Sequence, residues 1–325
     1  MELIINSLPV TEENYSDTMK TKVEPYLDKY RNEGFFEGWD KNKLHYEKYL
    51  VENASKNVVI VHGFTESTVK FREMIYVYML MGFNVFIYDQ RGHGKSFRYA
   101  EKTETVSVCK FDEYIKDLDL FINNVVKPDG AGLPLLLYGH SMGGAVSIQY
   151  LQEHPDVFEK AVLTAPMVLC KCHGLEPWFA LFLARFFCLI GQRHKETVGS
   201  KDFNPNREYT SSNNTSKARF DYINANKSAE RCLQTCNASY GWLKEAILVS
   251  RKNLDPERCK KITLPVLLCQ AEDDGSVYND KEEEFVKLVK NIRLERFPGS
   301  RHEIFGSVDK TMLPYLQTIE KFFKS

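Results

Sequence analysis

The sequence contains no long hydrophobic run, no block of charge of one sign, and little glycine or proline. Its 325 residues include 18 glycines and 12 prolines, which is not enough for a fibrous or low-complexity chain. Its 43 basic and 44 acidic side chains are spread along the chain and nearly cancel, so we expect no nucleic-acid partner. The remaining composition, 43% hydrophobic, is typical of a globular protein with a sizeable core.

Signals for export or membrane insertion are missing as well. The first residues read MELIINSLPVTEEN and lack the basic start and the apolar run of a secretory signal peptide. The most apolar stretch, WFALFLARFFCLI at residues 178–190, is too short to span a bilayer and contains Arg185. We therefore expect a soluble protein located in the cytoplasm.

The eight cysteines have no arrangement that requires a metal or a disulfide. Without a signal peptide they are expected to be reduced thiols. Cys170, Cys172 and His173 form a C-x-C-H cluster, which is similar to part of a metal site. No second pair has zinc-like spacing, because Cys232 and Cys236 have no histidine nearby. We therefore expect no metal and no cofactor.

Strand-like and helix-like patterns alternate along the chain. Short apolar runs, typical of strands buried on both faces of a parallel sheet, occur at residues 57–61, 84–88, 134–138, 161–163, 265–269 and 293–297. Helical patterns lie between them, at residues 71–81, 111–126, 144–154 and 280–289. Before them we expect an opening helix at 13–31 and two antiparallel strands at 35–39 and 44–51. The alternation predicts an α/β protein with a mostly parallel, doubly wound sheet.

One segment breaks this alternation. Residues 168–257 contain helical patterns and a polar stretch but no convincing strand. Long insertions in such sheets lie on the active-site side, beyond the carboxyl ends of the strands. We therefore predict a first core part at residues 1–167, an all-helical cap at 168–257 and a second core part at 258–325.

Residues 139–143 read Gly-His-Ser-Met-Gly and match the pattern G-x-S-x-G. A strand pattern precedes the motif and a helical pattern follows it, so Ser141 is expected on a sharp turn that exposes its hydroxyl. Glycines are needed there because side chains at those positions would collide with the neighbouring backbone. We predict that Ser141 is a catalytic nucleophile.

A serine hydroxyl needs a base, and the base needs an acid that orients it. After a turn of this kind, the partners follow in the order serine, acid, histidine. Seven of the eight histidines precede any acid-bearing strand, which leaves His302 as the base. Glu272, Asp273 and Asp274 follow the strand at 265–269, and position alone allows either aspartate as the acid.

Acyl transfer also needs two N–H donors that stabilise the oxyanion. One is expected from Met142, the residue after the nucleophile. The other is expected from the loop His62-Gly63-Phe64, which follows the strand at 57–61. We predict that Phe64 and Met142 form the oxyanion hole.

With these pieces in place, the chain resembles the α/β-hydrolase family of monoacylglycerol lipases and bacterial lysophospholipases. The matching motifs are VIVHGF at 59–64, YDQRGHGKS at 88–96, YGHSMGG at 138–144 and SYGWL at 239–243. The family's acid motif, P-x-L-L-x-Q-G-x-x-D, is similar to PVLLCQAEDD at 265–274, with Ala271 at the usual glycine. The resemblance therefore implies the α/β-hydrolase fold and selects Asp274 as the acid.

The apolar run at 178–190 bears on the substrate. It is expected either to pack within the cap or to form a wall for an acyl chain, with Trp178 and Phe182 as candidate substrate-binding residues. We predict a serine carboxylester hydrolase that acts through an acyl-enzyme on lysophospholipids or monoacylglycerols, with transient membrane contact through the cap. An esterase for small or aromatic acyl esters is the first alternative, and a catalytically silent binding protein of the same fold is the second.

Overall fold

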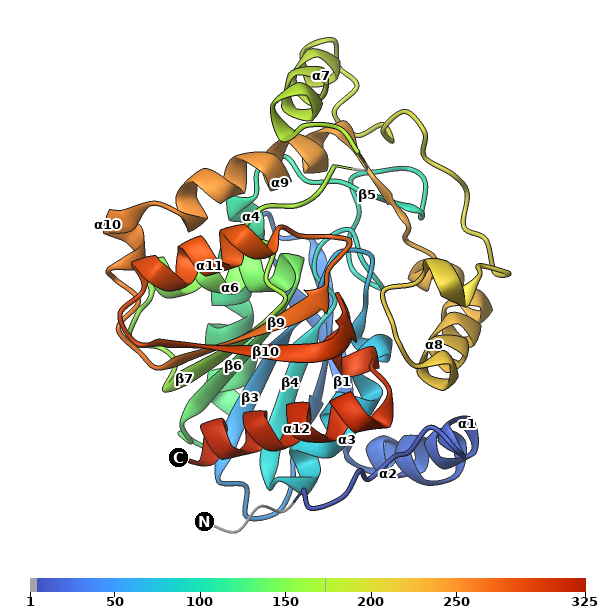
Figure 1. Cartoon of the computed structure of the whole chain (residues 1–325), viewed down its shortest axis with the longest axis vertical. Helices are drawn as coiled ribbons and strands as arrows, with labels where there is room; N and C mark the ends of the chain where they lie inside the picture. Colours follow the sequence, from blue (N-terminus) through green and yellow to red (C-terminus); the bar gives the residue numbers. More distant parts are fainter. Residues whose placement is uncertain (1–4, 173) are drawn as a thin grey trace.

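A mostly parallel sheet forms the centre of the molecule (Figure 1). The computed structural model describes residues 5–172 and 174–325, and within them the strand order is β1-β2-β4-β3-β6-β7-β9-β10. The bounds are β1 (Arg31–Glu37), β2 (Lys43–Tyr49), β3 (Lys56–Val61), β4 (Phe83–Tyr88), β6 (Leu135–His140), β7 (Lys160–Thr164), β9 (Val266–Asp273) and β10 (Ile292–Arg301). The pairs β1·β2 and β2·β4 are antiparallel, and the other pairs are parallel. The predicted mostly parallel sheet is confirmed.

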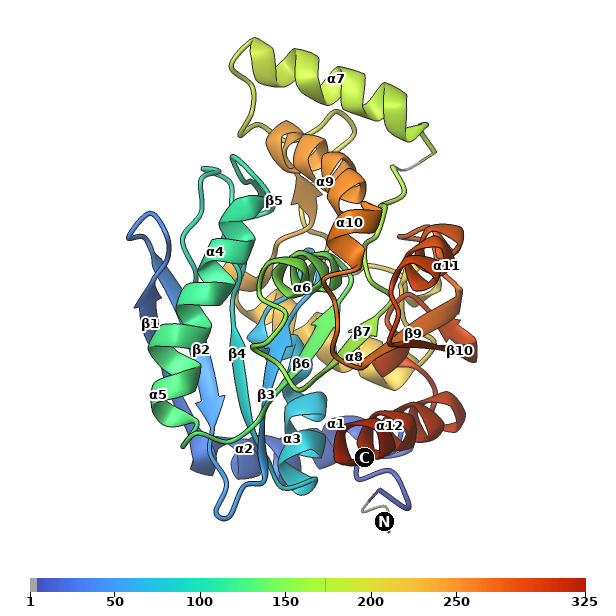
Figure 2. The same ribbon diagram turned by 90° about the vertical axis from the view of Figure 1, so that its left-hand side faces the viewer.

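Helices cover both faces of this sheet (Figures 1 and 2). Their bounds are α1 (Tyr15–Thr18), α2 (Glu24–Tyr30), α3 (Arg72–Leu80), α4 (Asp112–Phe121), α5 (Lys127–Asp129), α6 (Met142–Glu153), α7 (Pro177–Leu189), α8 (Lys217–Ala229), α9 (Tyr240–Asn253), α10 (Pro256–Cys259), α11 (Asn279–Leu288) and α12 (Asp309–Lys324). In β3, Val59 and Val61 join the core under α4, α6 and α11, whereas Val58 and Ile60 join the core under α3 and α12. Because both faces are covered, the strand is apolar throughout and shows no polar alternation.

The first helix differs from the one expected at residues 13–31. It consists of α1, a π-helical turn at Met19–Val23, and α2. Tyr15, Met19, Val23 and Leu27 are all buried, at a constant spacing of four residues. An ideal α-helix has 3.6 residues per turn and would rotate these side chains away from one face. The wider π-helical turn absorbs the difference and keeps them on the core.

Residues 168–172 and 174–257 lie on the side of the sheet where the parallel strands end, with α9 between α7 and the sheet (Figure 2). Besides helices α7, α8 and α9 they contain the short strand β8 (Asn237–Ala238), so the expectation of an all-helical segment is wrong in this place. β8 pairs in parallel with β5 (Thr105–Val106), which lies in the preceding part of the chain. Two residues are too few to leave a strand pattern in the sequence. The division of the chain into core and cap stays a prediction.

Helix α7 contains most of the apolar run singled out in the sequence. It has 13 residues, and its interior carries Arg185. Among residues 5–172 and 174–325, no helix combines the length and the apolar character needed to cross a bilayer. The cytoplasmic location stays a prediction.

Candidate active site

Ser141 lies at the turn between β6 and α6, as its motif predicts. Its backbone angles are φ 51° and ψ −118°, in a region that residues with side chains rarely occupy. The glycines on either side explain how the chain tolerates this turn. A Cβ atom on Gly139 would lie 2.3 Å from Ser147 Oγ, and one on Gly143 would lie 2.0 Å from the carbonyl oxygen of Val61. The tight turn therefore requires glycine at both positions.

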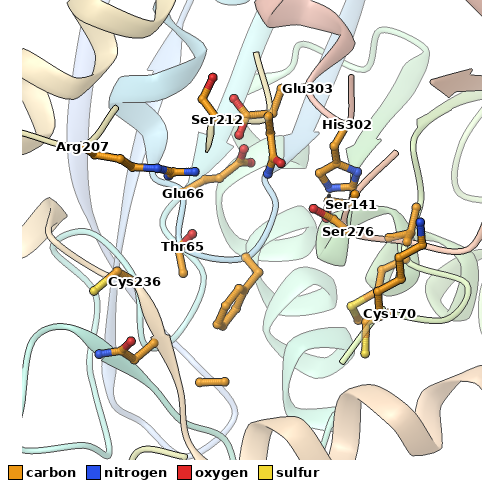
Figure 3. A pocket seen from close by; sticks show the side chains of 18 of the residues that line it. Thr65, Glu66, Ser141, Cys170, Arg207, Ser212, Cys236, Ser276, His302 and Glu303 are labelled. Atoms are coloured by element: carbon orange, nitrogen blue, oxygen red, sulfur yellow. Dashed lines mark hydrogen bonds between the residues drawn. The ribbon is translucent and has the colours of Figure 1, made fainter. Parts of the chain in front are cut away.

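The structure brings Ser141, His302 and Asp274 together in one hydrogen-bonded chain. His302 follows the last residue of β10, and its Nε2 atom lies 2.8 Å from Ser141 Oγ (Figure 3). Its Nδ1 atom lies 2.7 Å from Asp274 Oδ2. When Nδ1–H donates to the carboxylate, Nε2 is free to accept the proton of the serine hydroxyl. This is the geometry of a nucleophile, a general base and an orienting acid.

Asp274, and not Asp273, is the aspartate that contacts His302. Asp274 Oδ1 also accepts the N–H groups of Ser276 at 2.8 Å and Val277 at 2.9 Å. Burial raises the pKa of Asp274, but His302 and these two donors outweigh burial and hold the pKa below its ordinary value. Asp273 is exposed at the end of β9. Sequence position alone left both aspartates as candidates for the acid. In the structure, Asp274 at the turn after β9 contacts His302, whereas Asp273 is exposed to solvent.

Phe64 and Met142 flank the serine, as expected for oxyanion donors. Met142 is the first residue of α6, and Phe64 follows Gly63 in the loop after β3. A Cβ atom on Gly63 would lie 3.0 Å from Ser141 Cβ, so this loop passes directly beside the nucleophile. Within the described part of the chain, neither the Phe64 nor the Met142 N–H donates a hydrogen bond. Both donors are therefore available to a ligand.

A largely buried ion cluster beside the serine connects the loops that carry Phe64 and His302. Lys70 Nζ lies 2.8 Å from Glu66 Oε1 and 2.7 Å from Glu303 Oε1. Glu66 Oε2 accepts the N–H of Gly63 at 2.5 Å, which fixes the loop before Phe64. Burial raises the pKa of Glu66, but the Lys70 ammonium outweighs it, lowers the pKa and keeps the carboxylate ionised. The sequence did not reveal this cluster, because acidic residues in loops are usually exposed.

A cavity of about 950 Å³ opens above Ser141, between the strand ends and residues of the segment 168–257. Cys170 lies on one side of Ser141, and Glu66 and Arg207 lie on the other (Figure 3). The first side is called the apolar end, and its lining includes Met167, Cys170, Leu175, Ala180 and Val277. Lys171 lines this side as well, and its Nζ atom donates to the carbonyl oxygen of Asp274. The second side is the polar end, and its lining includes Thr65, Glu66, Arg207, Ser212 and Lys227. The nucleophile thus lies in one cavity, between a side with mainly apolar residues and a side with several polar and charged ones.

The expected placement of Trp178 and Phe182 in the cavity wall is wrong. Their side chains are 70% and 62% exposed, and neither lines the cavity. Helix α7 packs on α9 through the buried residues Ala180 and Ala184 and through Phe187, which stacks on Tyr240 with ring centroids 4.1 Å apart. Because the small residues face α9, the large aromatic residues face outward.

No side-chain group of the cavity is arranged as a metal site in the described residues. Cys170 and Cys172 are buried in the cavity wall, whereas His173 lies outside the described residues. The ligand atoms of Glu33, His45 and Glu47, on β1 and β2, lie within 4.8 Å of one another and are close enough to share a metal. Protein groups already occupy them, since His45 hydrogen-bonds both Glu33 and Asp89.

A serine at a strand-to-helix turn, with a histidine and an aspartate at the ends of later strands, defines an α/β-hydrolase. A family model described as serine aminopeptidase, S33, matches residues 52–309. The chain belongs to this family of hydrolases.

Two relatives cover most of the chain. It is 28% identical over 305 residues to lysophospholipase L2 of Escherichia coli, which is 90% of this chain and 87% of that protein. It is 25% identical to the monoglyceride lipase of Saccharomyces cerevisiae over 83% of this chain and 86% of that protein. Their names agree with the predicted class, a carboxylic ester hydrolase, and with the resemblance drawn from the motifs.

A solved structure carries the same fold. The crystal structure of a soluble variant of monoglyceride lipase from Saccharomyces cerevisiae, in complex with a substrate analog, superposes with a TM-score of 0.73. The sequence identity to it is 20%, and the match covers 90% of this chain and 94% of that chain. The predicted α/β-hydrolase fold is confirmed.

Proposed function

We propose that this protein is a serine carboxylester hydrolase that forms an acyl-enzyme at Ser141 and acts on lysophospholipids or monoacylglycerols. The observation that carries the proposal is the chain of two hydrogen bonds, 2.8 Å and 2.7 Å long, from Ser141 through His302 to Asp274. The names of the two long relatives support both substrate classes.

The proposed reaction has two halves. His302 Nε2 takes the proton of Ser141 Oγ as the oxygen attacks the ester carbonyl, and Asp274 stabilises the imidazolium that forms. The N–H groups of Phe64 and Met142 bind the oxyanion of the tetrahedral intermediate. When the intermediate collapses, the alcohol leaves with the proton from His302 and the acyl group stays on Ser141. Water then attacks this acyl-enzyme by the same route and releases the fatty acid.

The apolar end of the cavity supports an acyl chain as the bound group. Leu175, Ala180 and Val277 line it, and they offer carbon surface without a charge of their own. The total volume of about 950 Å³ lies at the upper end of the usual range for small-molecule sites, which is about 300–1,000 Å³. Each methylene that enters such a site contributes up to about 0.8 kcal/mol. Catalytic efficiency should therefore rise with acyl length.

We also propose that the outer face of α7 contacts the membrane surface in which such substrates reside. Six large apolar residues of this face are 38–85% exposed: Trp178, Phe179, Phe182, Phe186, Leu189 and Ile190. An apolar patch of this size on a soluble surface usually marks an interaction site. Ala180, on the inner face of the same helix, lines the cavity, so α7 lies between this patch and the apolar end.

A fluorophosphonate probe and a chain-length series test the proposed reaction. The probe should label the wild type on Ser141 and should leave Ser141→Ala unlabelled. Glyceryl esters from acetyl to palmitoyl should be cleaved with increasing efficiency. If the protein is labelled but prefers acetyl or aromatic acyl esters, its substrate is a small ester and not a lipid. If the folded protein shows neither labelling nor turnover, it is a silent binding protein.

A further inference from the structure

The cavity carries more positive charge than the chain as a whole. Five cationic side chains line it, against two carboxylates, although the net charge of the chain is −1. Lys70 already binds both carboxylates, Glu66 and Glu303. The other four cations form no ion pair with any described residue: Lys171, Lys201, Arg207 and Lys227. Charge of this kind in a ligand cavity favours an anionic ligand.

Lys227 holds its ammonium against the oxyanion loop. Its Nζ atom donates to the carbonyl oxygens of Thr65 at 3.0 Å and Thr235 at 2.6 Å. An ammonium group has three N–H donors, so one donor is left over. Thr65 follows Phe64 directly, which places this cation next to the proposed oxyanion donor. Burial and the neighbouring Lys70 lower the pKa of Lys227 to about 8, as expected for a cation without a carboxylate partner.

Arg207 provides a second cation at the same polar end. Its side chain points into the cavity in the direction of Glu66 (Figure 3). It donates one hydrogen bond to the protein, from Nη2 to the carbonyl oxygen of Ser211 at 2.8 Å. The guanidinium has five N–H donors in a planar fork, so most of them are free. A planar fork of this type binds two oxygens of a phosphate at once.

We propose that Lys227 and Arg207 bind the phosphate of the substrate, so that the enzyme prefers monoacyl glycerophospholipids to monoacylglycerols. This inference rests on the proposed ester hydrolysis at Ser141. With the acyl chain in the apolar end and the ester at Ser141, the glycerol of such a lipid leads into the polar end. A phosphate there meets two cations that have no other anionic partner, whereas the hydroxyl of a monoacylglycerol gains no charge interaction.

The test compares two substrates with the same palmitoyl chain in the same detergent, lysophosphatidylethanolamine and monoacylglycerol. Wild type should have the higher kcat/KM on the phospholipid. Arg207→Gln and Lys227→Met should each lower that value about tenfold to hundredfold, as expected when a charged hydrogen bond is lost. Arg207→Gln, which changes an exposed side chain, should alter monoacylglycerol hydrolysis less than threefold. Lys227→Met also removes the hydrogen bond to Thr65, so it should lower monoacylglycerol hydrolysis, but by less than it lowers phospholipid hydrolysis. The matched control is Lys217→Met, an exposed lysine of the same helix that pairs with Asp221.

A second readout separates phosphate binding from a structural role. Glycerol phosphate should inhibit monoacylglycerol hydrolysis by the wild type competitively, and the inhibition should be weak in Arg207→Gln and Lys227→Met. Equal losses on both substrates would overturn the inference and make Lys227 a clamp between Thr65 and Thr235. A wild type that cleaves both lipids equally well would overturn it too. Absence of fluorophosphonate labelling and of all ester hydrolysis would instead defeat the proposed function.

Discussion

The sheet and the segment 168–257 differ in the exposure of their apolar residues. In β3 the residues Val58 to Val61 are completely buried, and the loop after this strand approaches Ser141 so closely that Gly63 leaves no room for a side chain. In α7, by contrast, Leu189 is 85% exposed and Trp178 is 70% exposed. The sheet therefore holds Ser141 and its neighbours at fixed distances, whereas the segment above it exposes apolar side chains at its surface. Substitutions in the two regions should therefore impair different properties, the reaction rate in the first region and surface binding in the second.

Removing the base should have the largest effect. His302→Ala should lower kcat by about 10⁴–10⁶-fold on every ester, because all substrates share the proton transfer. The loss is measured as initial rates on short and long esters with the same protein preparation. Binding of a non-hydrolysable ester analogue should persist. A loss confined to long-chain esters would mean that His302 acts on the substrate and not on Ser141.

The two neighbouring aspartates sharpen this prediction. Asp274→Asn should lower kcat by about 10⁴-fold, because an amide favours the wrong tautomer of the histidine. Asp273→Asn is the matched control and should leave kcat within about twofold, since an exposed side chain away from the site has little influence. The measurement is the initial rate on one soluble ester. The reverse ranking would contradict the contact between Asp274 and His302.

A charge on the outer face of α7 should affect membrane contact without affecting chemistry. Phe182→Asp should reduce binding to lipid vesicles by tenfold or more. Removing one aromatic side chain that would be buried in the bilayer costs about 1.5–3 kcal/mol of binding free energy. Hydrolysis of a water-soluble ester should be unchanged. Vesicle flotation measures the binding, and Phe35→Asp serves as the control on the distant strand β1, where Phe35 is 54% exposed. Equal binding by both variants would mean that α7 does not contact the bilayer.

The smallest expected effect concerns the dependence of head-group selectivity on pH. The pKa of Lys227 is about 8, so its charge is present below this pH and is lost as the pH rises through it. The groups that act on Lys227 are Lys70, Cys236, Glu303 and Arg207. The ratio of kcat/KM for lysophosphatidylethanolamine over monoacylglycerol should therefore fall several-fold between about pH 7 and 9. Lys227→Arg keeps its charge and should remove this dependence. A ratio that falls equally in Lys227→Arg would assign it to another group.

The residues that could be predicted from the sequence are those that lie in a short motif or that are identified by their order along the chain. Ser141 lies in a five-residue motif between a strand and a helix, and His302 follows from the order of the histidines along the chain. Asp274 needed the family motif, because Asp273 satisfies the same position rule. These residues lie at strand ends, and the ends of parallel strands meet at one edge of a sheet.

The remaining features depend on contacts between distant segments. The apolar pattern of α7 predicted a helix but not its orientation, which depends on Ala180 and Ala184 facing α9. Lys227 reaches Thr65 from a helix far along the chain, and nothing in its neighbourhood in the sequence indicates this contact. Helix α12 was not predicted, although Met312, Leu316 and Ile319 are buried at helical spacing.

The ammonium of Lys70 affects how much the active site must reorganise during each turnover. One of its partners, Glu66, holds the loop that bears the Phe64 N–H, and the other, Glu303, follows His302 directly. The N–H that we propose as an oxyanion donor and the histidine that we propose as the base are therefore joined through one largely buried cation. Their relative positions are fixed when the chain folds, so the N–H donor and the histidine need little reorganisation in each turnover.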